Sequence, residues 1–282
     1  MLAYERMRIA LAYRLLQTLT NRFKPNTAAA YFFFSALAFL PFAIIDRITF
    51  TKTRYTQSQS LAGYETQGSF AELEAFERGG KIATVISAIV NRSLASNVSY
   101  DLFRREYIRQ IVPVLEAVKF ESVLEIGSGA SINLYYIRQW FPGKECIGMD
   151  FARERIRQAK TFWDKRKTSL SYARGDAAHL PFRDDSVDIV FSSHCLEQLS
   201  EDTKCEMAIR EMYRVSARKV VMMEPGFELG NLAQKSYIEL RGYSKHILSI
   251  VTRNGFKLAG YFLLGTTSNA LNPTMMIVVN KN

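Results

Sequence analysis

The clearest chemical signal in the sequence is a glycine-rich turn followed by an acidic residue. Glu125, Gly127 and Gly129 come at the end of a short apolar run and directly before a helical pattern. Glycines at such a turn let the chain bend tightly and let a ligand approach the backbone where a side chain would clash. Asp150 ends the next apolar run, 21 residues beyond Gly129, and its carboxylate could accept hydrogen bonds from both hydroxyls of a ribose. The spacing therefore predicts a ribose-bearing ligand at this turn.

A parallel sheet would bring these residues together, and the pattern from residue 122 onward predicts one. Short β-branched runs alternate there with longer helical segments, which is typical of βαβ units. We expect strands at residues 122–126, 145–149, 170–174, 187–191, 219–224, 257–264 and 275–280. We expect the helices between them at residues 131–140, 153–165, 203–215 and 235–254. The predicted fold class is α/β, a Rossmann-like seven-stranded and mostly parallel sheet with helices on both faces.

With these elements in place, the sequence resembles class I S-adenosylmethionine-dependent methyltransferases, in particular the small-molecule branch that includes the quinone and sterol methyltransferases. The resemblance covers about residues 100–281. The segments that carry it are VLEIGSGAS (123–131), GMD (148–150), GDAAHLPF (175–182), VDIVFSSHCLEQL (187–199) and REMYRV (210–215). It implies an enzyme whose cofactor is S-adenosylmethionine.

The resemblance also implies a contact for each matched position. Glu125, Gly127 and Gly129 would line the methionine moiety, and Asp150 would hold the ribose hydroxyls. The other implied cofactor contacts are Phe151 beside the adenine ring, Asp176 and the Ala177 backbone against the adenine, and Ser193 at the edge of the reaction pocket. One position departs from the pattern, because Ser131 stands where the family usually has a third glycine. The following helix is therefore expected to start slightly farther from the cofactor.

Catalytic and substrate-binding candidates surround this predicted pocket. His194, in the loop after the fourth strand, could be the general base for an oxygen nucleophile, or it could pack under the cofactor or bond a backbone carbonyl. Glu224, at the end of the fifth strand, could contact substrate or cap a turn. Tyr100 and Arg104, before the first strand, could cover the cofactor, anchor a phosphate-bearing substrate, or lie on a solvated basic helix.

Residues 1–60 form a hydrophobic and basic N-terminal segment. They hold eight Lys or Arg against two acids, 8 − 2 = +6 of the total net charge of +10. Inside them, residues 28–45 (AAAYFFFSALAFLPFAII) contain no charge. This run could lie in a membrane interface, pack in protein or at a dimer interface, or span a membrane. A span is disfavoured because Pro41 would kink the helix and the preceding basic residues would place the remaining chain outside.

The rest of the chain divides into two parts. Residues 61–118 are predicted to form a helical cap or lid, with helices at 70–78, 81–94 and 101–118, the last interrupted by Pro113. Residues 119–282 form the predicted methyltransferase domain. The three cysteines show no spacing typical of a zinc site or a disulfide framework, so a cytoplasmic location is expected and no metal site is predicted.

The acceptor is predicted to be a small or lipid-linked molecule, methylated on oxygen or carbon at the cytosolic face of a membrane. The positive charge favours anionic partners, which include a membrane surface and nucleic acid. Nucleic acid is expected less, because no Asn/Asp-Pro-Pro-Tyr element follows the fourth strand. Two other functions stay open at this point: an RNA methyltransferase, and a methyltransferase-fold assembly factor without catalysis.

Overall fold

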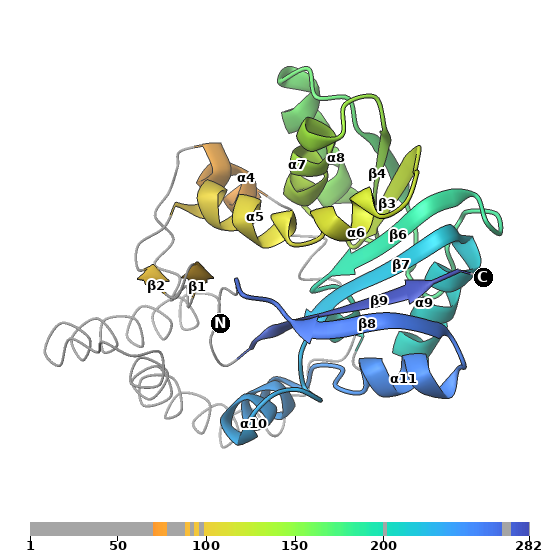
Figure 1. Cartoon of the computed structure of the whole chain (residues 1–282). Coiled ribbons are helices and arrows are strands. Elements are labelled where there is room, and N and C mark those ends of the chain that lie inside the picture. The colour runs from red at the N-terminus through yellow and green to blue at the C-terminus, as the bar shows by residue number, and fades with distance from the viewer. Residues whose placement is uncertain are drawn as a thin grey trace, which may run out of the picture.

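A twisted seven-stranded sheet forms the centre of the computed structural model (Figure 1). The structure describes residues 70–77, 88–90, 93–95, 99–199, 202–266 and 272–281. The strands of this sheet are β3 (Ser122–Ile126), β4 (Glu145–Asp150), β5 (Ser171–Arg174), β6 (Val187–Ser193), β7 (Ser216–Pro225), β8 (Lys257–Leu263) and β9 (Thr274–Asn280). All seven expected strands are therefore present, within three residues of the expected bounds.

The order of the strands is β5-β4-β3-β6-β7-β9-β8, and within this sheet β9 runs in the direction opposite to the other six strands. From β3 the chain proceeds outward to β4 and β5 and then returns to place β6 on the other side of β3. Ligands of such sheets bind outside the carboxyl ends of the strands where the strand order reverses. The fold therefore directs attention to the loops that follow β3, β4 and β6.

Helices cover both faces of the sheet because side chains alternate along each strand. On β3, Val123 belongs to one apolar cluster, whereas Leu124 and Ile126 belong to another. The first cluster includes residues of α4 (Phe70–Glu77), α5 (Tyr100–Arg109), α6 (Val112–Glu116), α7 (Ile132–Trp140) and α8 (Arg153–Lys165). The second includes residues of α9 (Asp202–Val215) and α11 (Ile247–Arg253). The predicted fold class is confirmed, and α4 to α6 share one core with the sheet.

Two helix predictions are wrong. The expected helix at 235–254 is two helices, α10 (Leu232–Arg241) and α11, because Gly242 adopts a left-handed conformation with φ of 69° and caps the end of α10. The expected helix at 81–94 contains instead β1 (Ala88–Val90) and β2 (Ser93–Ala95), an antiparallel pair. β-Branched residues such as Ile89 and Val90 favour a strand over a helix.

The segment before the sheet follows the prediction more closely. The helix expected at 101–118 is divided into α5 and α6, and Pro113 stands in the first turn of α6, where its missing N–H breaks no helical hydrogen bond. Residues 1–60, including 28–45, lie outside the described residues, so the predictions made for them stay predictions. Among the helices of the described part, none is long and apolar enough to cross a membrane.

Candidate active site

A cavity of about 380 Å³ opens at the carboxyl ends of β3, β4 and β6. All eight predicted cofactor contacts line it: Glu125, Gly127, Gly129, Asp150, Phe151, Asp176, Ala177 and Ser193. His194, Tyr100 and Arg104 line it as well, but Glu224 does not. The structure thus brings all the predicted site residues except Glu224 to one cavity.

The glycine-rich turn has the backbone conformation that its sequence predicts. Gly127 and Gly129 have φ of 67° and 51°, in the left-handed region that other residues rarely adopt. A Cβ on Gly127 would overlap the sulfur of Cys195, and a Cβ on Gly129 would overlap the Arg155 guanidinium. Ser131 also takes a left-handed conformation, with φ of 57°, and it is fully buried at the start of α7. The serine therefore keeps the backbone shape that glycine would give at this position.

Asp150 joins the turn after β3 to the turn after β4. Its Oδ2 accepts a hydrogen bond from the Gly129 N–H at 2.9 Å, and its Oδ1 accepts one from the Ala152 N–H at 2.9 Å. An ionised carboxylate has about four acceptor positions, so each oxygen keeps one for a ligand. This geometry suits the predicted bonds to two ribose hydroxyls.

Glu125 presents a buried carboxylate with one unpaired oxygen. Its side chain accepts a 2.6 Å hydrogen bond from Asn133 Nδ2 through Oε1, while its buried Oε2 has no hydrogen-bond partner among the described residues. Burial raises the pKa of Glu125 to about 8, although the Asn133 hydrogen bond and the charge of Arg104 act in the opposite direction. A cationic ligand beside Oε2 would therefore satisfy the oxygen and favour the ionised carboxylate.

Arg104 provides the complementary donor. Its guanidinium carbon lies 5.9 Å from the ring centroids of both Tyr100 and Tyr107, and its buried Nε has no hydrogen-bond partner among the described residues. The predicted alternative of a solvated basic helix face fits Arg105, whose side chain is 45% exposed. It does not fit Arg104, which lines the cavity. In this cavity, Arg104 could therefore donate to a carboxylate of a ligand, and Glu125 could accept from its ammonium group.

The opposite end of the cavity is a turn after β5. Asp176 Oδ1 accepts a 2.9 Å hydrogen bond from the Ala178 N–H, and Ala177 is buried beside it. Phe151 is 39% exposed and lines the cavity, so its ring has an open face for a planar ligand. These positions agree with the adenine contacts that the resemblance implies.

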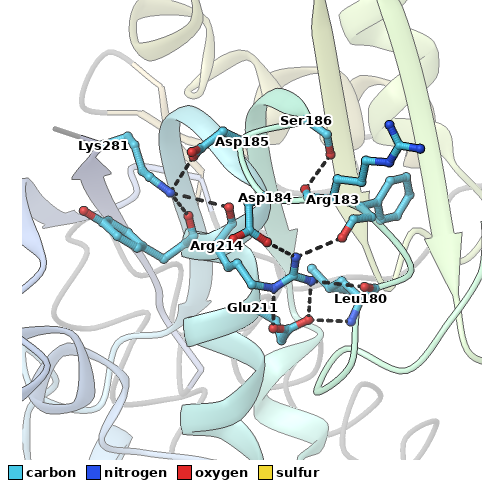
Figure 2. Close-up of polar contacts among 10 residues, drawn as sticks. Leu180, Arg183, Asp184, Asp185, Ser186, Glu211, Arg214 and Lys281 are labelled. Atoms are coloured by element: carbon cyan, nitrogen blue, oxygen red, sulfur yellow. Dashed lines mark hydrogen bonds and ion pairs between the residues drawn. The ribbon is translucent and has the colours of Figure 1, made fainter.

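An arginine-centred network holds the segment that continues from this turn (Figure 2). Arg214 of α9 donates to the carbonyl oxygens of Leu180 and Phe182 at 3.2 and 2.9 Å, and it pairs with Asp184 and Glu211 at 2.6 and 2.7 Å. Glu211 in turn accepts the Leu180 N–H at 2.8 Å. The REMYRV segment therefore fixes the loop that follows the adenine-side turn.

Glu224 of β7 binds the backbone of the loop after β6. The fully buried Glu224 carboxylate accepts hydrogen bonds from the N–H groups of Cys195, Leu196 and Glu197 at 3.2 to 3.3 Å. Burial raises the pKa of Glu224 to about 7. Of the two roles considered for Glu224, the geometry supports turn capping.

His194 lies in this loop with both ring nitrogens engaged. Its Nδ1 is 3.0 Å from Glu197 Oε2, and its Nε2 is 2.8 Å from Thr274 Oγ1. The backbone of His194 has a φ of 53°, and its N–H donates to the carbonyl oxygen of Met223 on β7 at 3.0 Å. Ser193, the residue before it, shares a 3.0 Å hydrogen bond with the Tyr107 hydroxyl.

Glu72, Arg155 and Asn133 are among the polar residues of the cavity that were not named from the sequence. Arg155 has a side chain that is only 14% exposed and pairs with Glu72 of α4 at 3.1 Å. Asn133 is the partner of Glu125. No local sequence pattern could identify Glu72 and Arg155 as site residues, because segments 83 positions apart in the sequence meet at this pair. Asn133 could have been identified, because it stands in the first turn of the helix that follows the glycine-rich turn.

Comparison with known proteins agrees with this geometry. Residues 124–222 match the family described as "Methyltransferase domain". A demethylmenaquinone methyltransferase of Renibacterium salmoninarum is 31% identical over 114 residues, which cover 40% of this chain and 44% of that protein. An uncharacterised methyltransferase of Bacillus subtilis is 34% identical over 94 residues, covering 33% and 35%. The chain thus spans less than half the length of either relative.

Solved structures share the fold at low sequence identity. The magnesium protoporphyrin IX methyltransferase of Synechocystis, solved with bound SAH, has a TM-score of 0.55 and 14% identity, with 78% of this chain and 97% of that chain covered. A [4+2]-cyclase has a TM-score of 0.60 and 15% identity, with 80% and 96% covered. These likenesses confirm the Rossmann-like fold over most of the chain.

Proposed function

We propose that this chain, whose residues 124–222 form a class I S-adenosylmethionine-dependent methyltransferase domain, transfers a methyl group from S-adenosylmethionine to a small-molecule acceptor. One observation carries the proposal. A cavity that holds an unpaired buried donor on Arg104 and an unpaired buried acceptor on Glu125 also holds the carboxylate of Asp150. An amino-acid group would supply the missing partners of Arg104 and Glu125, and a ribose attached to it would reach the remaining acceptor positions of Asp150.

The chain's own residues bind and orient the cofactor in this proposal. Arg104 holds the methionine carboxylate, Glu125 the ammonium group and Asp150 the ribose hydroxyls. Gly129 leaves room for the Arg155 guanidinium beside the turn. When bound, S-adenosylmethionine supplies an electrophilic methyl group on its sulfonium. The protein's contribution is alignment of the acceptor and exclusion of water.

The acceptor that we propose is small or lipid-linked and is methylated at the cytosolic face of a membrane. The support comes from the sequence of residues 1–60, where an uncharged run at 28–45 lies in a segment of net charge +6. Apolar insertion and attraction to anionic lipid would act together in such a segment. A demethylmenaquinone methyltransferase among the relatives fits an apolar acceptor.

A two-step experiment tests the function. Calorimetry first measures binding of S-adenosylmethionine to the full chain, and we expect micromolar affinity. The protein is then incubated with methyl-labelled cofactor and a membrane extract, and the label is followed into lipid, polar metabolites, RNA and protein. Label in lipid or in a small metabolite supports the proposal, whereas label confined to RNA or protein contradicts it.

A second candidate is use of this fold without methyl transfer. The observation that favours it is the likeness to a [4+2]-cyclase, at a higher TM-score than that of the protoporphyrin methyltransferase. Cofactor binding without any transfer of label in the experiment above would support this candidate.

A further inference from the structure

We infer that Glu197, and not His194, is the residue that receives the acceptor's proton, and that the acceptor atom is a hydroxyl oxygen. The inference rests on the methyl transfer proposed above and names the chemistry of its acceptor side. The evidence is the set of hydrogen-bond partners of the His194 nitrogens and the Glu197 oxygens in the loop after β6.

His194 has no nitrogen available for an acceptor. Its Nε2 contacts the hydroxyl of Thr274, a residue of β9 that is 1% exposed, and its Nδ1 contacts the Glu197 carboxylate. An imidazole can take a proton only through an unprotonated nitrogen that the donor can reach. A substrate would have to displace a buried side chain to reach either nitrogen of His194.

The charges around His194 favour its protonated form. Glu197 faces it from the 3₁₀ turn η1 (Leu196–Gln198), Glu224 from β7, and Arg104 and Tyr107 from α5. Burial lowers the pKa of His194, but the charge and hydrogen bond of Glu197 and the charge of Glu224 outweigh it, so that the pKa is raised. When it is protonated, His194 can donate through Nδ1 to Glu197 and through Nε2 to Thr274.

Glu197 is the carboxylate-bearing residue of η1, in the loop after β6. It lines the cavity, although its side chain is only 6% exposed. Its Oε2 is bonded to His194 and its Oε1 accepts a 2.9 Å bond from Gln198 Nε2, which leaves each oxygen one further acceptor position. Its backbone N–H is fixed by Glu224 at 3.3 Å. His194 is thus a positioning residue that orients Glu197.

The reaction balances with Glu197 as the proton acceptor. The acceptor oxygen forms a bond to the methyl carbon while the bond from that carbon to sulfur breaks, and the electron pair of the broken bond stays on sulfur. The hydroxyl proton moves to the Glu197 carboxylate and then to solvent. A hydroxyl acceptor needs such a base, because its proton must leave as the bond from oxygen to the methyl carbon forms.

Three variants of the full chain test the inference. Glu197→Gln keeps the size of the side chain but removes its basicity, His194→Gln keeps a donor toward Glu197, and Glu145→Gln is a control on an exposed glutamate at the amino end of β4. The probe is methyl-labelled S-adenosylmethionine with a solvent extract of lipids and small metabolites. We expect Glu197→Gln to lower the rate of label transfer about a hundredfold, His194→Gln about tenfold, and the control less than twofold.

Two further measurements separate the outcomes. Calorimetry should give all variants a cofactor affinity within about threefold of the wild type. NMR of labelled histidine, in a chain with only three histidines, should show a raised pKa for His194 that falls in Glu197→Gln.

An unchanged rate in Glu197→Gln, or a loss in His194→Gln as large as in Glu197→Gln, would overturn the inference while the proposed methyl transfer stands. A wild-type protein that binds no cofactor or moves no label would overturn both proposals.

Discussion

Protonation of Glu125 should control cofactor affinity near neutral pH. Burial raises the pKa of this carboxyl to about 8, so below pH 8 it is mostly neutral. The ammonium group of the ligand, with an ordinary pKa of about 8 for an α-amine, needs the ionised carboxylate beside it. Binding below pH 8 must therefore remove a proton, at a cost of about 1.4 kcal/mol for each pH unit below the pKa.

The expected result is an affinity for S-adenosylmethionine that rises about tenfold per pH unit between pH 6 and 7.5, with release of about one proton per ligand. Calorimetry in phosphate and in Tris measures both quantities, because the two buffers differ in ionisation enthalpy. Glu125→Gln, which cannot ionise, should show a flat profile and no proton release. A flat wild-type profile without proton release would refute the role given to Glu125.

The same carboxyl should affect the stability of the unliganded protein. A pKa raised from 4.5 to about 8 means that the folded chain binds this proton more tightly than the unfolded chain does. The free energy of unfolding should therefore decrease as the pH rises from about 4.5 to 8. Glu125→Gln should melt close to the wild type at pH 5 and above it at pH 8. Melting temperatures that differ equally at both pH values would contradict this reasoning.

Four other substitutions test the remaining parts of the site and of the N-terminal segment. Asp150→Ala should weaken cofactor binding by about 1.5 to 3 kcal/mol, or roughly ten- to a hundredfold by calorimetry, because charged hydrogen bonds to the ribose are lost. Gly129→Val should abolish binding, since φ is 51° and the new side chain would meet Arg155. Arg214→Ala should lower the free energy of unfolding by about 1 to 3 kcal/mol in a denaturant titration, because the loop of Figure 2 loses its clamp. Reversing the charge of three arginines within residues 1–14 should reduce flotation of the full chain with anionic vesicles, and equal flotation would leave the membrane proposal without support.

The residues that sequence predicted well are those that one local element fixes. A strand, a glycine-rich turn and a helix follow one another around Gly127, so the positions of Glu125 and Gly129 depend on nearby sequence alone. The position of Asp150 could be predicted for the same reason, because it is the last residue of the next strand, β4. The β-branched runs identified the strands because alternate side chains enter two different cores.

The residues that sequence missed are those that tertiary packing brings in from elsewhere. The contact of His194 with Thr274 joins residues 80 positions apart, and the pair of Glu72 and Arg155 joins residues 83 apart. No local pattern predicts such contacts. The division at Gly242 was visible in the sequence, because glycine is the residue that most often caps the end of a helix.

Part of the cavity wall comes from outside the segment that matches the methyltransferase family. The segment that matches the methyltransferase family ends at residue 222 and begins at residue 124, so it includes Glu125, Asp150 and Glu197. The cavity is completed by Glu72, Tyr100 and Arg104 of α4 and α5, which lie before that segment, while Thr274, the partner of His194, lies after it. Proteins that share only the matched segment would share the turn and the ribose carboxylate, but not these walls. Under the proposed methyl transfer, we expect the walls supplied before β3 and by β9 to influence which acceptor is bound. Exchanging α4 between relatives should therefore change which acceptor is methylated, whereas α5, which carries Arg104, should stay in place so that cofactor binding persists.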